Sequence, residues 1–576
     1  MLEELNDAQK ARVSIREFKT TTDALILRGY YKPQGAMGQT LEHALRTISP
    51  EIYGSMNDSQ RVELDGLVYV IDRLPIGIEE CNQTTLSAAE GLDHGFKRII
   101  PLKRRRTSYR VNDREMCFEI TKGRSEIYDL VTHLTFLNVE AKKIKHRGYH
   151  ESEKTQEWIE LEEMVLEKRP RQSLDREIWN LSKVLGRSFD ETKKAYEKLE
   201  ANANTANSGL FKIVYWLGRR VAEADQSKDL EHLTLFTTSL IEMIGHHKYG
   251  EIWATAIKKS LNDLGLHERP IHIISSNLHS VLNLLYGYPI ATERQDIYDM
   301  VKSLRDRENL VLEHAKNHGL YYLADQSGTY IDCQIIDTAR LDFDNLHPQV
   351  LSDRSYVLKE KPVILVIDYA FGEQAFEVMD ELLKPYLQWH MPVKSLSIMG
   401  KAGILEGDKG DLMLADAHIF EGTTDTYLCQ NQLHKEDFDA TVNVYRGPMV
   451  TVLGTSLQNK KMLNYFMESS WKAVGLEMEG GHYQKAIQAA IIRKHISSNV
   501  TLRYAYYASD NPVKTGLTLA SGSMGEGGIK PTYMITNIFL QKILNAQGSE
   551  LNTRVFPRND VEESSISVND KKGKRK

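Results

Sequence analysis

The sequence predicts an α/β protein in which a mostly helical N-terminal region precedes a layered α/β domain. Three observations predict this class. Apolar residues recur at three- and four-residue spacing through much of the first 265 residues. Short, continuous apolar segments typical of strands begin near residue 271. From residue 362 onward such segments alternate with helical ones, which is the pattern of an α/β domain.

Length and composition limit the class of protein further. The 576 residues exceed one ordinary core, so we expect two to four domains. Hydrophobic content of 41% and charged content of 26% are typical of a globular protein, and the net charge of −6 does not call for a nucleic-acid partner. The four cysteines are widely spaced, which argues against a disulfide framework and against a thiolate metal site.

The chain offers no targeting or membrane signal. Its first residues, MLEELNDAQKARVSIREF, are charged and lack the apolar core of a signal peptide. No apolar run approaches eighteen residues, so we expect no membrane partner and a cytoplasmic location by default.

Residues 1–265 form the predicted helical N-terminal domain, whose role stays open. The clearest helix covers 125–144, where Ile127, Leu130, Val131 and Leu134 share one face behind Ser125 as the expected N-cap. Similar patterns predict helices at Trp158–Leu166, Phe189–Leu199, Leu210–Ala224, Leu230–Ile244 and Ile252–Leu264.

Residues 266–354 are predicted to be a connecting α/β segment. Ile271–Ser276 is an expected strand that leads into a helix at Leu278–Leu285. Two further strands are predicted at Tyr321–Leu323 and Thr329–Ile336.

Residues 355–547 are predicted to be the layered α/β domain. The strongest strand is Val363–Ile367, a continuous apolar run of the buried kind. Further strands are expected at Ser395–Met399, Asp411–Ala415, Met449–Leu453, Ala473–Leu476 and Leu502–Tyr507. Helices are expected at Ala375–Leu383, Lys460–Glu468, His482–Arg493 and Ile535–Leu544. Residues 548–576 are polar and predict a disordered tail.

Four short segments of the C-terminal domain carry the chemistry. They are Asp368–Ala375, Ile398–Leu405 with Gly410–Leu414, Arg446–Val452, and the pair Gly475–Gly481 and Ala508–Pro512. The last pair places an acid at the end of each of two strands, in Glu477-Met478-Glu479 and in Ser509-Asp510-Asn511-Pro512.

In this order and spacing, the segments resemble the nucleoside phosphorylase superfamily, and within it most closely the AMP nucleosidases. The resemblance covers about a third of the chain. It implies a three-layer αβα domain with a central mixed sheet and a homo-oligomer. The implied activity is hydrolysis of the ribose–base bond of a purine nucleoside or nucleotide, without a cofactor.

The resemblance also implies the roles of the acids. Asp510 is the expected catalytic residue, a general acid that protonates the departing base, and such help contributes about 10²–10⁴-fold. This role needs a carboxyl whose pKa is raised by burial. Glu479 is expected to accept hydrogen bonds from the ribose hydroxyls, and Met478 to lie against the apolar face of the sugar. No metal is expected, since no zincin spacing is recognised among the nineteen histidines.

Donors for a phosphate or water are expected on the other side of the sugar. Backbone N–H groups of Gly372 and Gly400, at presumed strand–helix turns, suit an anion. Lys401 and Arg446 are expected to add positive charge. The alternative for both basic residues is an ordinary surface ion pair.

Plainer interpretations stay open beside the catalytic one. Glu477 and Glu479 are two residues apart, so an exposed strand edge would place both on the same side. Asp510 precedes Asn511-Pro512, a sequence that favours turns. The segment Ser521–Gly528 is either a lid or a surface loop. The basic run Lys103–Arg106 is best interpreted as a solvated or intramolecular charge cluster.

Departures from the family pattern leave the substrate open. Ala402 replaces a glycine, and Asn511 stands where the family has lysine. Two other functions therefore remain alternatives. One is a phosphorylase in which orthophosphate attacks the ribose. The other is a nucleotide-binding protein that has lost turnover.

Overall fold

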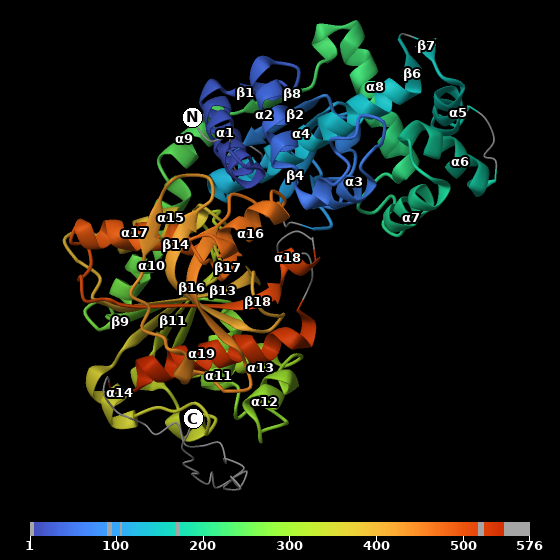
Figure 1. The fold of residues 1–576 in the computed structure, drawn as a ribbon. Helices are drawn as coiled ribbons and strands as arrows, with labels where there is room; N and C mark the ends of the chain where they lie inside the picture. The colour runs from blue at the N-terminus through green and yellow to red at the C-terminus, as the bar shows by residue number, and fades with distance from the viewer. Residues whose placement is uncertain are drawn as a thin grey trace, which may run out of the picture.

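The computed structural model describes residues 5–88, 95–103, 106–151, 153–168, 173–515 and 524–546. The N-terminal part, coloured blue to green, lies against one end of a second part coloured green to red (Figure 1). The predicted tail and residues Ser521–Ser523 of the expected lid lie outside the described residues. Within the described residues, no helix combines the length and the apolar character needed to cross a bilayer.

Helices make up most of the N-terminal part. They are α1 (Asp7–Arg28), α2 (Ala36–Ile48), α3 (Leu64–Ile71), α4 (Gly123–Gly148), α5 (Gln156–Val165), α6 (Leu174–Leu185), α7 (Phe189–Glu200), α8 (Leu210–Gln226) and α9 (Thr238–Gly245). The predicted helices at 125–144, 158–166, 189–199 and 210–224 are confirmed as α4, α5, α7 and α8.

A six-stranded sheet, which the sequence analysis did not predict, runs through this same part. Its strand order is β1 (Tyr30–Tyr31), β8 (Leu233–Phe236), β2 (Gln83–Ser87), β5 (Glu115–Glu119), β4 (Thr107–Asn112) and β3 (Arg98–Ile99). The strands are only two to six residues long, so no single window carried enough alternation to predict them.

Two local predictions in this part were wrong. The helix expected at Leu230–Ile244 is instead strand β8 followed by α9, because Thr237 ends the strand and caps the helix with its hydroxyl, 3.3 Å from the Leu240 N–H. Helix α4 begins at Gly123 behind Lys122, so Ser125 is not its N-cap. The Ser125 hydroxyl instead accepts a hydrogen bond from the Glu373 N–H in the second part of the protein.

Helix α4 forms the centre of the N-terminal part. It is 26 residues long and most of its side chains are buried, including several charged ones. The buried charges are paired: Arg106 contacts Asp129 at 2.7 Å and Glu126 at 3.4 Å. Lys103 pairs with Asp72 at 3.1 Å. The two described members of the basic run therefore belong to intramolecular pairs, as predicted.

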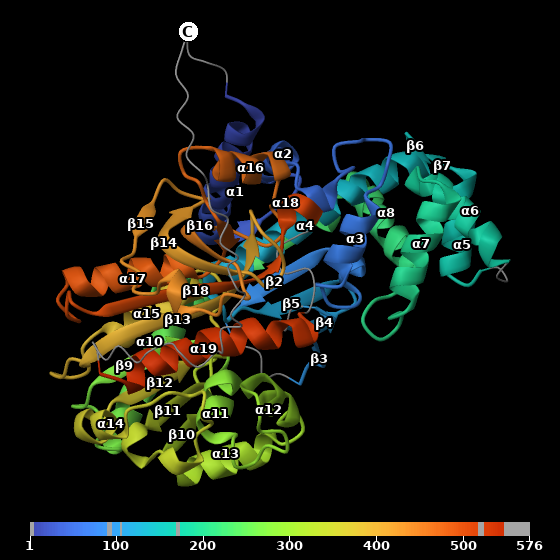
Figure 2. The same cartoon turned by 60° about the horizontal axis from the view of Figure 1, so that its bottom comes forward.

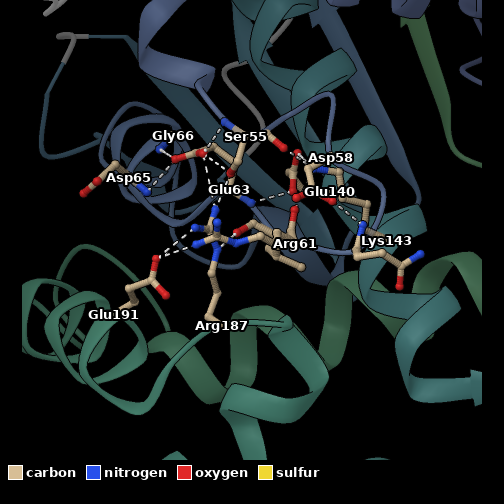
Figure 3. Close-up of polar contacts among 12 residues, drawn as sticks. Ser55, Asp58, Arg61, Glu63, Asp65, Gly66, Glu140, Lys143, Arg187 and Glu191 are labelled. Carbon is tan, nitrogen blue, oxygen red and sulfur yellow. Dashed lines mark hydrogen bonds and ion pairs between the residues drawn. The ribbon is translucent and has the colours of Figure 1, made fainter.

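A second polar network fastens the loop before α3 to α4 and α6 (Figure 3). Lys143 donates to the carbonyls of Ser55 and Arg61 at 3.1 and 2.9 Å and pairs with Glu140 at 2.9 Å. The Glu63 carboxylate accepts from the Ser55 N–H at 2.8 Å and caps α3. Beyond the loop, Arg187, which follows α6, pairs with Glu191 of α7 at 3.1 Å, so the network joins several elements and indicates a structural role.

The C-terminal part is built on a 10-stranded mixed sheet. Its path is β10 (Leu320–Leu323), β11 (Cys333–Asp337), β12 (Val363–Ile367), β9 (Ile271–Ser275), β13 (Val393–Ile404), β17 (Gly475–Glu477), β16 (Val444–Thr451), β14 (Leu412–Phe420) and β15 (Thr426–Leu428), with β18 (Thr501–Asp510) paired to β13 and β14. The strands expected from 271 onward are present, and β13 and β14 are longer than predicted.

Helices cover both faces of this sheet (Figures 1 and 2). Helices α10 (Lys248–Asp263), α15 (Gln374–Leu383) and α17 (Gly480–Ile492) share one buried apolar cluster with the strands. Helices α11 (Leu278–Tyr286), α12 (Ile297–Ser303), α13 (Glu308–Asn317) and α19 (Ile529–Leu544) share another. Helix α10, which the sequence analysis assigned to the N-terminal domain, packs on this second sheet.

The remaining helices are short and lie around the sheet; they are α14 (Arg354–Glu360), α16 (Lys460–Glu468) and α18 (Pro512–Thr515).

The two parts share one apolar core. The cluster that includes α1, α2 and α4 also contains Ile419, Val450, Leu453, Leu476 and Met478 of the second part. Helix α16 carries Met462 and Phe466 into the same cluster. The N-terminal part therefore lies over β14, β16 and β17 at the end where β16 and β17 finish.

Candidate active site

Strand β13 changes partner at the centre of the sheet, and this change positions the candidate site. One side of β13 is paired with β18 from Ser395 to Gly403. The other side is paired with β9 up to Ile398 and with β17 from Gly403 onward. Residues 399–402 therefore lie between the ends of β9 and β17. Crevices at such changes of strand partner are where open α/β sheets bind ligands.

Glu477 ends β17 and is a structural carboxylate. Its side chain is 1% exposed. It accepts hydrogen bonds from Thr451 Oγ1 at 2.5 Å, from the Glu479 N–H at 2.6 Å and from the Gly480 N–H. Burial raises the pKa of Glu477, while these hydrogen bonds act to lower it. The residue fixes the start of α17, so an exposed strand edge is excluded here.

Glu479 and Gly372 are in direct contact, although the sequence analysis expected the Gly372 N–H on the other side of the sugar. The N–H of Gly372 donates to Glu479 Oε1 at 3.0 Å. Gly372 has φ +55°, a conformation that L side chains rarely adopt, and its turn follows β12. This N–H is consequently engaged by a protein carboxylate, whereas the prediction assigned it to an anionic ligand.

Met478 lies beside the same turn. Its side chain is 5% exposed, and its Cε is 3.7 Å from where a Cβ on Gly372 would stand. It belongs to the core that the two parts share. Met478 therefore packs in this core beside the Gly372 turn, and its predicted contact with a sugar stays a prediction.

Ser125 of α4 completes this turn from the N-terminal part, and the sequence analysis missed it. The N–H of Glu373 donates to Ser125 Oγ at 2.8 Å, across 248 residues of chain. A Cβ on Gly372 would stand 2.3 Å from the same hydroxyl oxygen. No local signal could have found this residue, because its partner is remote in sequence.

Tyr483 of α17 and Ser275 at the end of β9 lie next to the point where β13 changes its partner from β9 to β17. Their hydroxyl oxygens are 3.0 Å apart, which ties α17 to the end of β9. Burial raises the pKa of Tyr483, and the carboxylates of Glu479 and Asp368 add to the rise. Both tyrosine and serine were overlooked because neither stands in a recognised segment.

Asp510 ends β18 on the opposite side of β13. It is paired with Gly403, which is also paired with Leu476 of β17. Since neighbouring strands are about 4.8 Å apart, the backbones at Asp510 and Leu476 are about 10 Å apart. The Ser509 hydroxyl donates to the Asp510 carboxylate. The Asp510 side chain is half-buried at the end of its strand, not in an isolated turn.

Lys401 lies near Asp510, and its expected role at an anion site stays a prediction. Burial lowers the pKa of Lys401, and the nearby Asp510 carboxylate opposes that shift. Asn511, where the family has lysine, donates to the carbonyls of Leu405 and Gly407 at 3.2 and 3.1 Å. It therefore holds the turn after β13.

The predicted position of Gly400 was wrong. It lies inside β13, paired with Tyr506, and not at a strand–helix turn. A Cβ there would be 2.7 Å from the Tyr506 ring, so the glycine permits close packing of that ring. The continuous β13 runs past this position because β18 pairs with it throughout.

Arg446 is not brought to the other residues. Its guanidinium donates to the carbonyls of Leu433 and Asn431 at 2.6 and 3.1 Å. Arg446 is five residues before Thr451 on the same strand, and Thr451 contacts Glu477. Five residues of extended strand span about 16 Å, so Arg446 is far from Glu477. Arg446 instead holds the segment around Leu433.

Two groups of side chains among the described residues have the spacing of metal ligands. They are His314, His318 and Asp342, and His247, Asp380 and Glu381. Neither group includes an acid of the candidate site. The arrangement itself offers two carboxylates that approach β13 from its two sides, an apolar methionine, and several hydroxyl groups.

Comparison with known proteins gives a family but no activity. A model described as "Family of unknown function (DUF6909)" matches residues 39–315 and 298–545. No curated protein matches the sequence.

The comparison with solved structures gives matches of low similarity. The chain is 12% identical to the 5′-methylthioadenosine/S-adenosylhomocysteine nucleosidase of Campylobacter jejuni, covering 48% of this chain and 98% of that one, with a TM-score of 0.30. Futalosine hydrolase of Helicobacter pylori is 11% identical, with 48% and 98% covered and a TM-score of 0.29. Uridine phosphorylase of Schistosoma mansoni is 11% identical, with 50% and 90% covered and a TM-score of 0.31.

Proposed function

The chain belongs to the family of unknown function DUF6909, and we propose that its C-terminal part hydrolyses the N-glycosidic bond of a purine nucleoside or nucleotide. The observation that carries the proposal is the pairing of Glu479 with Gly372 beside the partner change of β13, while Asp510 ends the strand on the other side. Two carboxylates thereby flank one short stretch of strand, residues 399–403.

The proposed reaction divides the work between these acids. Glu479 accepts hydrogen bonds from the ribose hydroxyls and holds the sugar, with Met478 against its apolar face. Asp510 gives its proton to the base as the bond from C1′ to the base nitrogen breaks, and the bonding electrons leave with the base. A water oxygen bonds to C1′, and the proton that the water loses restores Asp510 through solvent.

Two observations favour water over phosphate as the nucleophile. The Gly372 N–H already binds Glu479, and the Arg446 guanidinium already binds two backbone carbonyls. Two of the four donors expected for an anion are therefore engaged within the protein. Orthophosphate would need to displace a carboxylate, which is a like charge, from the first of them.

The N-terminal part contributes to this site in the proposal. Ser125 holds the turn at Glu373, next to the Gly372 that orients Glu479. Ser125 is thus a positioning residue, and the catalytic unit is the whole chain.

The test is base release by the purified full-length protein. Adenosine, inosine, guanosine, their 5′-monophosphates and 5′-methylthioadenosine are incubated with and without phosphate, and free base is measured by chromatography. We expect release that does not depend on phosphate. Asp510→Asn should lower the rate by about 10²–10⁴-fold, and Glu479→Gln by about a hundredfold.

The matched control is Asp299→Asn, an exposed aspartate of α12 that pairs only with Lys302 on the surface. It should keep the wild-type rate. If base release requires phosphate, hydrolysis is rejected and the protein is a phosphorylase. No release from any compound, together with a ligand-induced rise in melting temperature, would replace it by the nucleotide-binding alternative.

A further inference from the structure

Three side chains with metal-binding atoms meet at the end of α13, away from the candidate active site. His314 lies in the last turn of α13, His318 follows its end, and Asp342 comes from the segment after β11. One ligand atom from each lies within 4.8 Å of the others, and all three side chains are partly buried. The sequence analysis missed this group and was wrong that no zincin spacing occurs, because His314 and His318 are four residues apart, although Ala315 stands where a zincin has glutamate.

The hydrogen bond of His318 leaves its outer nitrogen available to a metal. Its Nδ1 lies 2.9 Å from the carbonyl oxygen of His314, so Nδ1 carries the proton and donates it. The lone pair is then on Nε2, which faces Asp342 Oδ2 at 3.9 Å. A backbone carbonyl that fixes the tautomer in this way is a common support of metal-bound histidine.

The distances suit a small metal ion after a slight closure. Zinc binds histidine nitrogen and carboxylate oxygen at about 2.0–2.2 Å, so two tetrahedral ligands are about 3.3–3.5 Å apart. The 3.9 Å between His318 and Asp342 needs to shorten by about half an ångström. His318 and Asp342 belong to segments at the protein surface, and a closure of about half an ångström is a small movement for such segments.

The charges around the group also favour a cation. The C-terminal end of α13 presents the negative end of the helix dipole. Asn345 donates to Asp342 Oδ2 at 2.8 Å, and this bond is the main reason that the pKa of Asp342 is lowered.

In the other group, which consists of His247, Asp380 and Glu381, the two carboxylates are already paired with cationic side chains. Lys384 contacts both Asp380, at 3.4 Å, and Glu381, and Arg493 contacts Asp380 at 3.0 Å. A metal at His247 would have to displace two cationic side chains. This difference separates the two groups and supplies a matched control.

We propose that His314, His318 and Asp342 bind a divalent transition metal of the zinc type, with water in the remaining position. Two imidazoles and one carboxylate are ligands that zinc accepts readily, whereas magnesium prefers oxygen ligands. The metal would join the end of α13 to the Asp342 segment. The proposed metal site is near Asp337, which is paired with the first residue of β12. The candidate active site follows the last residue of β12, so the two sites lie at opposite ends of this strand.

The test is zinc binding by calorimetry to full-length protein that has been treated with EDTA and desalted, with magnesium as the comparison. We expect one zinc per chain with a dissociation constant below about 10 µM, a rise of several degrees in melting temperature, and no comparable effect of magnesium. His318→Ala and Asp342→Asn should each weaken zinc binding at least tenfold. Without metal, both variants should melt near the temperature of the metal-free wild type.

His247→Ala is the matched control and should bind zinc as the wild type does. The proposal is overturned if wild type binds no zinc in this range, or if His318→Ala and Asp342→Asn bind it unchanged. Loss of binding in His247→Ala would likewise reject it, because the metal would then occupy the other group. Base release is not part of this test, so its outcome is independent of the proposed activity.

Discussion

At the scale of single residues, Glu477 and Glu479 have different tasks although they are two positions apart. Glu477 is buried and binds backbone N–H groups at the start of α17. Glu479 is only half-buried and accepts the N–H of Gly372. The strand ends between them, which turns the second acid away from the first. Of these two acids, Glu477 therefore has a structural role and Glu479 has the proposed functional one.

Ser125 provides a residue-scale prediction that rests on the proposed activity. Ser125→Ala removes the acceptor of the Glu373 N–H and should let the Gly372 turn shift, so that Glu479 is misplaced. We expect kcat/KM for base release to fall about 10- to 100-fold. The melting temperature should fall by only a few degrees.

Ser173→Ala is the control for this variant, since Ser173 precedes α6 without a side-chain capping bond. It should change neither quantity. A purely structural role for Ser125 would lower its melting temperature while leaving the kinetics of the folded enzyme at 25 °C unchanged. Those kinetics therefore decide between positioning and packing.

At the scale of elements, the start of α17 is packed against a buried pair of rings. A Cβ on Gly480 would stand 2.0 Å from the Tyr506 hydroxyl oxygen and 2.6 Å from His418 Nε2. Those two atoms are themselves 3.1 Å apart. The helix can approach β14 and β18 this closely only because its first residue has no side chain.

Gly480→Ala should consequently destabilise the protein. Overpacking of this kind costs about 1–3 kcal/mol, measured as the change in unfolding free energy by denaturant titration. Gly245→Ala is the matched control, because a Cβ there would meet no atom within 4 Å. It should be neutral or slightly stabilising. Equal stability of the two variants would show that α17 can shift away from the rings.

At the scale of the whole molecule, the junction of the two parts contains a buried acid. Glu377 of α15 is 5% exposed, and its Oε1 is 2.6 Å from where a Cβ on Gly123 of α4 would stand. Burial is the main reason that its pKa rises to about 8, and Glu373 adds to the shift while Arg124 opposes it. The junction is therefore most stable when this carboxyl is protonated.

The resulting pH dependence has a definite sign. In the unfolded chain Glu377 ionises near its ordinary pKa of 4.5, but in the folded protein only near 8. Its contribution to stability is full below about pH 4.5 and is lost as the pH rises to about 8. Glu377→Gln should melt close to wild type at pH 5 and above it at pH 9, measured by calorimetry.

The exposed Glu468→Gln should follow wild type at both values of pH, as the control for this comparison. If Glu377→Gln melts below wild type at pH 9, the carboxylate is stabilised in the junction and the inferred sign is wrong.

The sequence by itself determined part of the elements, chiefly the longer helices and the strands of the second sheet, and the order of the recognised segments. Apolar periodicity is a property of each window, so α4, α5, α7, α8 and most strands of the second sheet were predictable. The acids of Glu477–Glu479 and Asp510 were predictable for a related reason, because each ends a strand that has its own apolar signal.

Only the tertiary structure decided which residues share the site. Gly400 lies within a strand because β18 pairs along its whole length, and Arg446 is held by the carbonyls of another segment. Ser125 meets the Gly372 turn, and His318 meets Asp342, across gaps in the chain that no local pattern spans. Hydrogen bonds and packing between remote segments set these contacts, whereas periodicity reports only the face that each segment buries.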